Sequence, residues 1–477
     1  MDQNSEYIVV DLDGTLIRTD LLLESVLLFI KSNLLNLFLL IAWVFRGRAF
    51  LKARIAERVN INAENLPYRE DLLDYLRKLN EQGKTLLLAT ASHEKYANEV
   101  AGYLGIFKGV LATTEHYNMK GSRKLAAIRE KLEGNQFAYA GDSRADMPLW
   151  EASDSCIMVN APKEAVQAAQ QQGKAIENFN DEHSTLTEFL REMRLYQWVK
   201  NILIFVPVFT SHNYQDTGHI LHAGIAFISF GLCASGVYFL NDLLDLNADR
   251  HHKSKRNRPL ASGRLPILHG LLGAAGLPLL GFLLAIYTLP LNFVLVMALY
   301  YLITNAYSFW FKQMATVDVM ILAILYTLRI VAGSAAEDIA LSSWLLAFSV
   351  FVFLSLAYLK RYIEVSALED NKTVRGRGYS AADSETMFSL GISNITASVL
   401  VLALYINSEE IAGLYHSPMI LWLLCLLTMF WGNRIWVRAR RGEIHDDPIV
   451  FAIKDRVSQL VGVAFVIVVL AAKYISL

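Results

Sequence analysis

The chain has few cysteines, no leader-like start and almost no net charge. Its three cysteines stand far apart along 477 residues, which excludes a disulfide framework and a zinc site with ordinary cysteine spacing. The amino-terminal sequence MDQNSEYIVVDLDGTL lacks a basic segment followed by a long apolar core. We therefore expect no cleavable signal peptide and place the first domain in the cytosol. The formal net charge of -1 averages unlike parts of the chain, so it gives no information about partners.

Apolar residues are abundant, and they are distributed unevenly. The hydrophobic share of 54% and the mean hydropathy of +0.32 average a soluble-looking first part with a strongly apolar remainder. A chain of this length also exceeds one ordinary domain. The predicted organisation is a soluble domain over residues 1–182, an amphipathic linker helix over 183–199 and a membrane domain over 200–477.

Short apolar runs in the first domain end in acidic or hydroxyl residues. They read YIVVDL at 7–12, TLLLATAS at 85–92 and FAYAGDSRAD at 137–146, and helical stretches lie between them. This alternation predicts a doubly wound α/β fold with a parallel sheet. Ligands of such sheets bind at the carboxyl ends of the strands, where these polar side chains stand.

The motifs DLDGTL at 11–16 and GDSRAD at 141–146 resemble the paired motifs of the haloacid dehalogenase superfamily of phosphohydrolases. The resemblance covers about the first 180 residues and implies a Rossmann-like α/β domain with a helical cap at about 17–84. It implies that Asp11 is the nucleophile for the phosphoryl group and that Asp13 is the general acid and base. Aspartates two apart at a strand end point to different sides of the attacked phosphorus, which suits these roles.

The same resemblance implies a magnesium site and contacts to the phosphate. Lys120 is a rival of Lys124 for the neutralising cation, since both stand near the expected place. The residues implied are Asp11, Asp13, Asp142 and Asp146 as metal ligands, Thr90 as a phosphate ligand and Lys124 as the cation.

The insert between these motifs contains a very apolar run over residues 34–45. This run is shorter than the roughly 20 residues that a membrane-spanning helix needs. It can be interpreted as a buried core of the cap, an interfacial membrane anchor or a short membrane hairpin. We favour the anchor, because Arg46, Arg48, Lys52 and Arg54 follow at once and suit lipid headgroups.

The remainder of the chain contains about nine apolar segments that are candidates to cross a bilayer, so we expect an all-α polytopic membrane domain. Basic residues gather in the loops after the second, fourth, sixth and eighth segments, and the intervening loops contain no Lys or Arg. The positive-inside rule therefore predicts that the basic loops and the first domain are cytoplasmic and the carboxyl terminus is outside. The segments are 200–213, which is short, 219–240, 267–288, 291–311, 317–337, 343–362, 386–406, 417–437 and 458–476.

A charged stretch, YFLNDLLDLNADRHHKSKRNRPLASG at 238–263, follows the second segment. Asp242, Asp245 and Asp249 are spaced three and four residues apart, so we expect them on one helix face. Clustered carboxylates suit Mg²⁺, and charges at membrane depth are costly unless they have a function. The alternative is a solvated basic loop beside an unrelated acidic helix end. Six cationic residues suit a phosphorylated ligand: Arg250, Lys253, Lys255, Arg256, Arg258 and Arg264.

This stretch and the spans around it resemble the UbiA superfamily of intramembrane prenyltransferases over about residues 190–477. The sequence YQWVKNILIFVPVF at 196–209 is similar to the QWVKN signature of the decaprenyl-phosphate phosphoribosyltransferase branch. The superfamily's second acidic motif is reduced here to Asp318, near Lys312. Arg329, in the middle of the fifth span, is expected to reach the cavity instead of lipid. The resemblance implies Mg²⁺ and catalysis at Asp242, Asp245 and Asp249, and substrate contacts from Asn241, Lys200, Lys253, Arg256, Lys312 and Asp318.

Together these resemblances predict a bifunctional membrane enzyme with Mg²⁺ in both domains. The membrane domain is expected to transfer 5-phosphoribose from phosphoribosyl diphosphate to a polyprenyl phosphate. The phosphatase is expected to remove the 5-phosphate, giving polyprenyl-phosphoryl ribose for cell-envelope glycans. The expected partners are these substrates and membrane lipids, without nucleic acid, and a homo-oligomer is left open. The expected location is a bacterial inner membrane.

Two other functions fit parts of the sequence. An aromatic prenyltransferase with a prenyl diphosphate donor uses the same metal chemistry, but it explains neither QWVKN nor the lone Asp318. A non-catalytic scaffold or transporter accounts for charged residues in the spans. It explains poorly why acidic and basic residues cluster at one membrane face.

Overall fold

The computed structural model describes residues 5–181, 183–368, 377–445 and 447–475. The chain forms two compact units. The first comprises Met1–Met193 and Tyr238–Ala275, and the second comprises Arg194–Val237 and Gly276–Leu477. The Asp-rich stretch therefore belongs to the same compact unit as the amino-terminal α/β domain.

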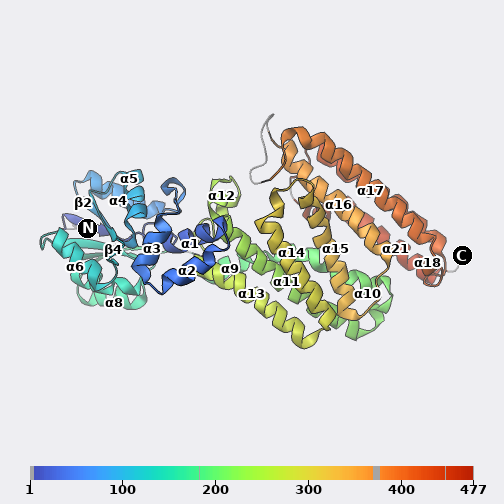
Figure 1. The fold of residues 1–477 in the computed structure, drawn as a ribbon, viewed down its shortest axis with the longest axis horizontal. Coiled ribbons are helices and arrows are strands. Elements are labelled where there is room, and N and C mark those ends of the chain that lie inside the picture. Colours follow the sequence, from blue (N-terminus) through green and yellow to red (C-terminus); the bar gives the residue numbers. More distant parts are fainter. Residues whose placement is uncertain (1–4, 182, 369–376, 446, 476–477) are drawn as a thin grey trace. The chain divides into compact units, whose positions relative to one another are not determined.

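A six-stranded parallel sheet forms the centre of the first unit (Figure 1). Its strand order is β3-β2-β1-β4-β5-β6, and β1 pairs with β2 and β4 on either side. The expected doubly wound α/β fold is confirmed. The strands are β1 (Tyr7–Val10), β2 (Thr85–His93), β3 (Gly109–Thr113), β4 (Phe137–Gly141), β5 (Ser155–Val159) and β6 (Ala175–Phe179).

Helices cover both faces of the sheet, because successive strand residues point to opposite sides. Ile8 and Leu86 pack against α4 (Glu70–Glu81) and α5 (Glu94–Leu104). On the other face, a second core contains Val9 and Leu87 with residues of α6 (Ser122–Lys131), α7 (Met147–Ala152) and α8 (Lys163–Gln171). These two cores fix the strand ends that carry the catalytic motifs.

Three helices form the insert after the first motif: α1 (Leu21–Ser32), α2 (Asn36–Val44) and α3 (Arg48–Ala56). Within the apolar run at 34–45, Leu40 and Trp43 are buried in the core that α1 shares with the sheet. The rest of the run is largely exposed, including Phe38 at 70% and Phe45 at 86%. The run is therefore not simply the buried core of the cap.

The Asp-rich stretch is not one continuous helix. Helix α11 (Thr217–Leu244) ends just before Asp245, and α12 (Leu246–His251) begins just after it. Asp245 has φ −104° and ψ 13°, outside the helical geometry, so the direction of the backbone changes between the second and third aspartates. The expected shared helix face for all three carboxylates is thus interrupted.

Apolar helices make up the second unit, and two of them, α11 and α13, are shared with the first unit. Among the described residues, eight helices are long and apolar enough to cross a membrane. The first expected segment, 200–213, instead forms a shorter helical stretch, η3 (Leu195–Phe205) followed by α10 (Val206–Thr210). The eight are α11, α13 (Ile267–Thr288), α14 (Leu291–Phe309), α15 (Val317–Glu337), α16 (Ser343–Ser366), α17 (Ser384–Ile406), α19 (Trp422–Arg440) and α21 (Arg456–Tyr474).

The short stretch Leu195–Thr210 is extended by its 3₁₀ geometry. A 3₁₀ helix rises about 2.0 Å per residue and an α-helix about 1.5 Å, so η3 and α10 together reach about 30 Å. That reach equals the thickness of a bilayer's hydrocarbon core, which is about 30 Å. A side chain at Gly333 of α15 would collide with the carbonyl oxygen of Ile204, so the two backbones are in close contact. Among the described residues, the expected nine segments therefore correspond to eight long helices and one shorter helical stretch.

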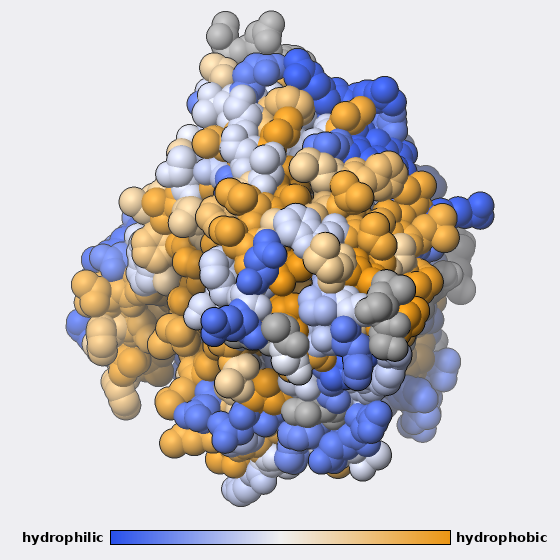
Figure 2. Space-filling view, turned by 90° about the vertical axis from the view of Figure 1, so that its right-hand side faces the viewer, coloured by the Kyte–Doolittle hydropathy of each residue, from blue (hydrophilic) through white to orange (hydrophobic). Residues whose placement is uncertain are grey.

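The outward sides of the long helices are apolar. Only 17% of the apolar 18-residue stretch of α21 and 22% of that of α14 are buried. Figure 2 shows hydrophobic side chains spread over much of one face of the molecule, with polar side chains at its upper and lower margins. Lipid is the medium in which such helix surfaces are stable. The chain is a multi-pass membrane protein.

Candidate active sites

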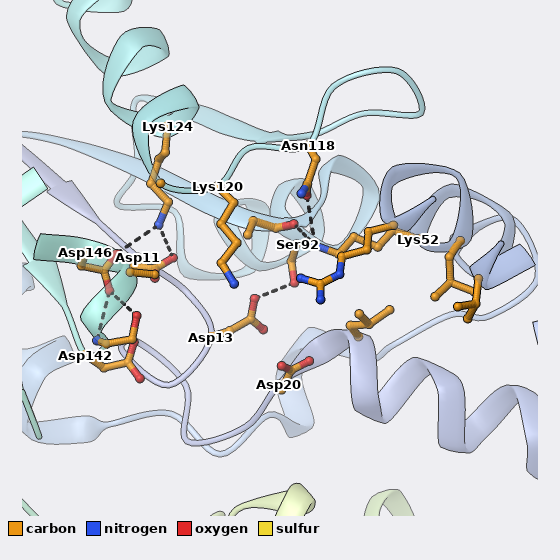
Figure 3. A pocket seen from close by; sticks show the side chains of 18 residues that line it. Asp11, Asp13, Asp20, Lys52, Ser92, Asn118, Lys120, Lys124, Asp142 and Asp146 are labelled. Atoms are coloured by element: carbon orange, nitrogen blue, oxygen red, sulfur yellow. Dashed lines mark hydrogen bonds and ion pairs between the residues drawn. The ribbon is translucent and has the colours of Figure 1, made fainter. Parts of the chain in front are cut away.

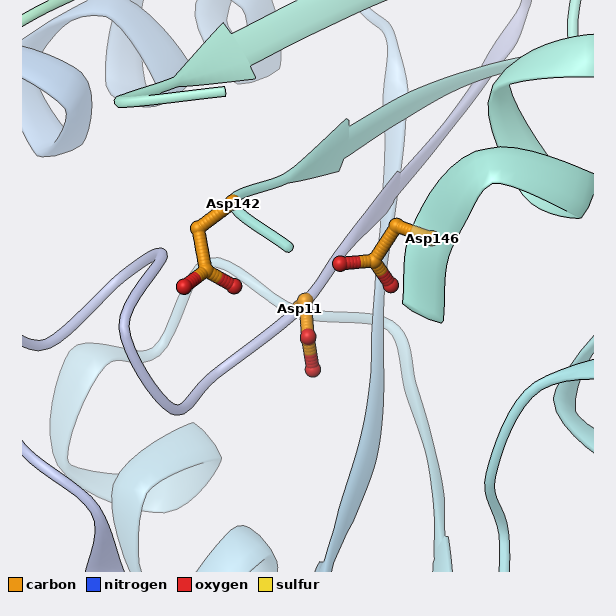
Figure 4. Close-up of side chains that lie close together, drawn as sticks. All are labelled: Asp11, Asp142 and Asp146. Carbon is orange, nitrogen blue, oxygen red and sulfur yellow. The ribbon is translucent and has the colours of Figure 1, made fainter. Parts of the chain in front are cut away.

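Three carboxylates converge at the carboxyl ends of β1 and β4. Asp11 directly follows β1, Asp142 follows β4, and Asp146 stands one turn later (Figure 4). Each offers an oxygen atom, and these atoms lie within 4.8 Å of one another. Gly14, with φ +77°, allows the loop after β1 to pass beside Asp142, because a Cβ atom there would collide with that carboxylate. Such a group of oxygen atoms fits a hard divalent cation.

Lys124 of α6 is the cation beside these carboxylates. Its Nζ lies 3.0 Å from Asp11 Oδ1 and 3.7 Å from Asp146 Oδ1, and it donates to the Tyr139 hydroxyl at 3.0 Å. The Tyr139 hydroxyl in turn donates to Asp146 at 2.7 Å. The rival, Lys120, also lines the pocket, and the close-up shows it beside Asp13 (Figure 3). Of the two lysines, Lys124 is the one in contact with the predicted nucleophile.

Asp13 is held by groups from the insert and from β2. The backbone N–H of Leu21 donates to it at 2.8 Å, and the Ser92 hydroxyl donates at 2.6 Å. The Thr90 hydroxyl is fully buried, donates to Asp13 at 3.3 Å and accepts from the Ser92 N–H. Thr90 thus orients the predicted acid and base, while Ser92 lines the pocket itself. Sequence reasoning missed Ser92, although it belongs to the same run of hydroxyl residues.

Burial raises the pKa of three carboxyls at this site, those of Asp11, Asp13 and Asp142. Desolvation, with the nearby aspartates adding to it, raises the pKa of Asp142 to about 7. Burial also raises the pKa of Asp11 to about 6, although Lys124 opposes the shift. For Asp13, burial and the neighbouring Asp20 raise the pKa to about 7, which suits proton transfer near neutral pH.

The insert supplies the outer wall of this pocket. Asp20 and Leu22 line it from α1 and the residue before it, Val44 from α2, and Arg48, Leu51 and Lys52 from α3. Lys52 donates to the Ala91 carbonyl at 2.6 Å, which fixes its ammonium group near the site. The sequence did not predict that these residues and Asn118 line the phosphatase pocket, because they lie in the insert or in a loop that carries no motif.

Two of the three aspartates in the Asp-rich stretch share one guanidinium group. Arg258 Nη1 lies 2.9 Å from Asp242 Oδ1 and 2.5 Å from Asp249 Oδ2. Two carboxylate oxygens that meet at one cationic nitrogen also fit a divalent cation at that point. Asp245 is paired differently, with Lys31 of α1 at 2.9 Å.

A buried ion pair joins α1 to α12. Arg250 donates to both oxygens of Glu24, at 3.0 and 2.5 Å, and to the Ala261 carbonyl at 2.9 Å. The side chains of Glu24 and Arg250 are 2% and 6% exposed. The other predicted ligands of this stretch differ in exposure, with Asn241 half-buried and Lys253 and Arg256 exposed.

Arg329 lies in a polar and aromatic setting inside the second unit. Its guanidinium donates to Asn201 at 3.0 Å and to the Tyr300 hydroxyl at 3.2 Å, and it stacks over the ring of Tyr326. Arg329 is therefore buried in protein, as expected for a charge at membrane depth. Asn201 belongs to the QWVKN sequence, so this motif packs directly against α15.

Asp318 and Arg361 form the centre of a buried ionic network. Arg361 Nε lies 2.5 Å from Asp318, and the Tyr379 hydroxyl also donates to that carboxylate. Both side chains are at most 1% exposed. Arg377 stands 3.7 Å from Asp318 and adds a second guanidinium group. Lys312, the predicted neighbour, lies in the short helix η6 (Phe311–Gln313).

Lys200, the lysine of the QWVKN sequence, is paired with Asp447. The Nζ–Oδ2 distance is 3.0 Å, and Lys360 approaches the same oxygen at 3.3 Å. Half-buried Asp447 has its pKa held well below the usual value, because Lys360 and Lys200 outweigh the effect of desolvation. Sequence reasoning missed Asp447 and Tyr379, and it counted Arg361 and Arg377 only among the basic residues at the cytoplasmic ends of the spans.

Replacing Arg361 by methionine is expected to destabilise the membrane domain by about 3–5 kcal/mol, because it leaves a buried carboxylate without its closest cation. Reversible unfolding of the full-length protein in mixed micelles measures this change. Arg441→Met, at a side chain that is 69% exposed, is the matched control and should have little effect. Equal stability of the two variants would show that Asp318 does not depend on Arg361.

Comparisons with known proteins agree with the division of the chain into an amino-terminal α/β domain and a membrane domain. The model of the UbiA prenyltransferase family matches residues 203–454, and that of haloacid dehalogenase-like hydrolases matches residues 8–151. An uncharacterized protein, y4nM, of Sinorhizobium fredii is 37% identical over 95% of this chain and 89% of its own length. The similarity thus extends through both units.

Two further relatives match more than half of this chain. The nodulation protein NoeC of Azorhizobium caulinodans is 34% identical over 55% of this chain and 85% of its own length. The decaprenyl-phosphate phosphoribosyltransferase of Mycolicibacterium smegmatis is 30% identical over 60% of this chain and 92% of its own length. The chain belongs to the UbiA prenyltransferase family, is related within it to decaprenyl-phosphate phosphoribosyltransferases, and carries a haloacid dehalogenase-like hydrolase domain at its amino terminus.

Proposed function

We propose that this enzyme transfers 5-phosphoribose from phosphoribosyl diphosphate to a polyprenyl phosphate and then removes the 5-phosphate. The observation that carries the proposal is the presence in one chain of a phosphoribosyltransferase-related membrane domain and an assembled aspartate phosphatase site. The transfer product retains a sugar phosphate monoester. The phosphatase domain in the same chain then hydrolyses this phosphate monoester.

In the transfer step, an oxygen of the lipid phosphate bonds to the anomeric carbon of ribose as the bond to diphosphate breaks. The lipid phosphate is ionised near neutral pH, so the step needs no strong protein base. Asp242 and Asp249 are the residues that fit Mg²⁺, which neutralises the departing diphosphate when bound. Asp245 completes this set in our proposal. Substrate phosphates are assigned to Asn241, Lys200, Lys253, Arg256 and Lys312.

Asp318 and Arg329 act on the substrate indirectly in this proposal. Asp318 orients Arg361 and Arg377, which are the guanidinium groups next to it. Arg329 fixes Asn201 and so holds the QWVKN sequence, with Lys200 beside Asn201, against α15. Additional cationic side chains suit a donor that carries one phosphate more than a prenyl diphosphate.

In the second step, an Asp11 oxygen attacks the phosphorus of the 5-phosphate and the phosphorus–oxygen ester bond breaks. Asp13 gives its proton to the leaving oxygen of the ribose. Asp13 then accepts a proton from the water that hydrolyses the aspartyl phosphate. Lys124 balances the negative charge on Asp11 and the phosphate. Asp11, Asp142 and Asp146 fit a Mg²⁺ ion, which neutralises the phosphoryl oxygens when bound, and we assign Asp13 to the edge of this metal site.

The positive-inside rule supports a cytoplasmic location for both sites in a bacterial inner membrane, with the carboxyl terminus outside. Labelling of Lys473, near that terminus, by a membrane-impermeant amine reagent on intact cells tests this orientation.

Competition binding tests which donor substrate the enzyme uses. Phosphoribosyl diphosphate should displace a labelled phosphoribosyl diphosphate analogue from the purified protein, and geranyl diphosphate should not. Displacement by geranyl diphosphate alone would favour an aromatic prenyltransferase.

The Mg²⁺ concentration that half-saturates the phosphatase is expected to fall as pH rises from 5 to 8. The raised pKa values of Asp11 and Asp142 mean that protons compete with the metal for these carboxylates at low pH. The fall should be at most about tenfold per pH unit for each proton displaced. Hydrolysis of p-nitrophenyl phosphate measures it, and Asp249→Asn serves as the control for metal bound at the Asp-rich stretch. A half-saturating concentration that does not change with pH would contradict this assignment.

A further inference from the structure

An apolar surface without a protein partner lies on α2 of the amino-terminal domain. Only Leu40 and Trp43 of this helix turn inward, where Trp43 stacks on Phe29 with ring centroids 5.3 Å apart. The outer side, called the α2 surface below, consists of large hydrophobic residues with exposed fractions between 39% and 86%: Leu34, Leu35, Leu37, Phe38, Leu39, Ile41, Val44 and Phe45. Burying one such side chain is worth about 1.5–3 kcal/mol, so leaving eight of them in water is costly.

Basic side chains border the α2 surface. Arg46 and Arg48 follow it directly and are exposed. The Arg46 guanidinium lies 4.0 Å above the ring of Phe50, and that of Arg58 lies 4.9 Å above the ring of Trp43. Exposed apolar residues beside guanidinium groups are the composition of a helix that lies in a bilayer interface next to phosphate headgroups.

Contacts within the first unit place α2 close to the end of a membrane span. Lys31, at the end of α1, donates to the carbonyl of Leu244 at 2.7 Å and pairs with Asp245 at 2.9 Å. Leu244 is the last residue of α11, one of the eight long apolar helices. Helix α2 begins soon after Lys31, at Asn36. The hydrophobic medium available to the α2 surface is therefore the bilayer that α11 crosses.

The same insert forms the wall of the phosphatase pocket. Val44, from the end of the α2 surface, lines the pocket that contains Asp11 and Asp13, and Arg48 and Lys52 line it from α3. Figure 3 shows Lys52 on the opposite side of this pocket from the three metal-binding aspartates. One end of the α2 surface therefore borders the route to the catalytic carboxylates.

We propose that the α2 surface inserts into the cytoplasmic leaflet and that the phosphatase takes its phosphate monoester directly from the membrane along Val44, Arg48 and Lys52. Arg46 and Arg48 contact lipid phosphates at the surface. The membrane insertion stands on the contacts above, whereas the route for a lipid-linked substrate rests on the proposed function.

The depth of α2 can be measured in the full-length protein. The three native cysteines are buried, so a single Phe38→Cys substitution can be labelled with an environment-sensitive fluorophore. In nanodiscs of phosphatidylethanolamine and phosphatidylglycerol, lipids with a nitroxide near the headgroup should quench the label at position 38. A label at exposed position 136, introduced by Gln136→Cys, should not be quenched. Equal quenching at both positions, or shielding of position 38 that depends on a second copy of the protein, would overturn the proposal.

The substrate route has its own test. Phe38→Asp combined with Ile41→Asp should lower dephosphorylation of the lipid-linked phosphoribose at least about tenfold, because charge removes the favourable burial in lipid. Hydrolysis of p-nitrophenyl phosphate by the same protein should stay unchanged, which shows that the domain is folded. An equal rate on the lipid substrate would overturn the route. If the unaltered protein does not act on that lipid at all, the proposed function fails, while quenching at position 38 still decides the insertion.

Discussion

Under the proposed function, replacing Asp11 by asparagine is expected to stop the enzyme at polyprenyl-phosphoryl 5-phosphoribose. The amide of asparagine is a poor nucleophile, so the aspartyl phosphate does not form, and phosphate release should fall by about 10³-fold or more. Phosphoribosyl transfer should continue, because Asp11 belongs to a different set of carboxylates from Asp242 and Asp249. Mass spectrometry of the extracted lipids distinguishes the phosphorylated from the dephosphorylated pentose.

Asp154→Asn is the matched control for this substitution. Asp154 is exposed and stands before β5, and its contact is a 3.4 Å hydrogen bond from Ser5. This variant should give the same lipid products as the unaltered protein. Dephosphorylated lipid from Asp11→Asn, at the normal rate, would show that the amino-terminal domain does not act on the transfer product.

Replacing Asp249 by asparagine should lower phosphoribosyl transfer by about 10²–10³-fold, because the departing diphosphate loses part of its metal neutralisation. Asp249 is buried and shares Arg258 with Asp242, so a neutral side chain there leaves only one of the two carboxylates that meet at this point. Hydrolysis of p-nitrophenyl phosphate should be unchanged in this variant. Release of labelled diphosphate measures the transfer.

A charge-matched control for Asp249→Asn is Glu385→Gln. Glu385 is 77% exposed and lies 3.5 Å from Arg440, so its loss should alter transfer little. If Asp249→Asn transferred phosphoribose as fast as Glu385→Gln, the Asp-rich stretch would not be the diphosphate site.

The α/β domain and its carboxylates could be predicted because local sequence determines them. A buried strand followed by Asp11 and another followed by Asp142 necessarily deliver both side chains to one edge of a parallel sheet. The different positions of Thr90, which orients Asp13, and Ser92, which lines the pocket, could not be predicted. They depend on which hydroxyl faces the pocket, and that is set by the packing of β2 against its neighbours.

The membrane domain shows a different limit. Long apolar helices are evident from hydropathy, but the break at Asp245 is not, because the spacing of three and four residues fits an unbroken helix equally well. The partner of Asp245 is Lys31, more than two hundred positions away in sequence. Likewise Asp318 was visible as a lone acidic residue, but its partners Arg361 and Arg377 come from other parts of the chain. Long-range ion pairs leave no periodic trace in the sequence.

Reconstitution with defined substrates tests the proposed function most directly. The purified full-length protein is incubated in nanodiscs with polyprenyl phosphate, Mg²⁺ and phosphoribosyl diphosphate labelled in the ribose. We expect labelled polyprenyl-phosphoryl ribose, with one diphosphate and one inorganic phosphate released for each ribose transferred. Diphosphate release without a labelled lipid-linked pentose would contradict the proposed function.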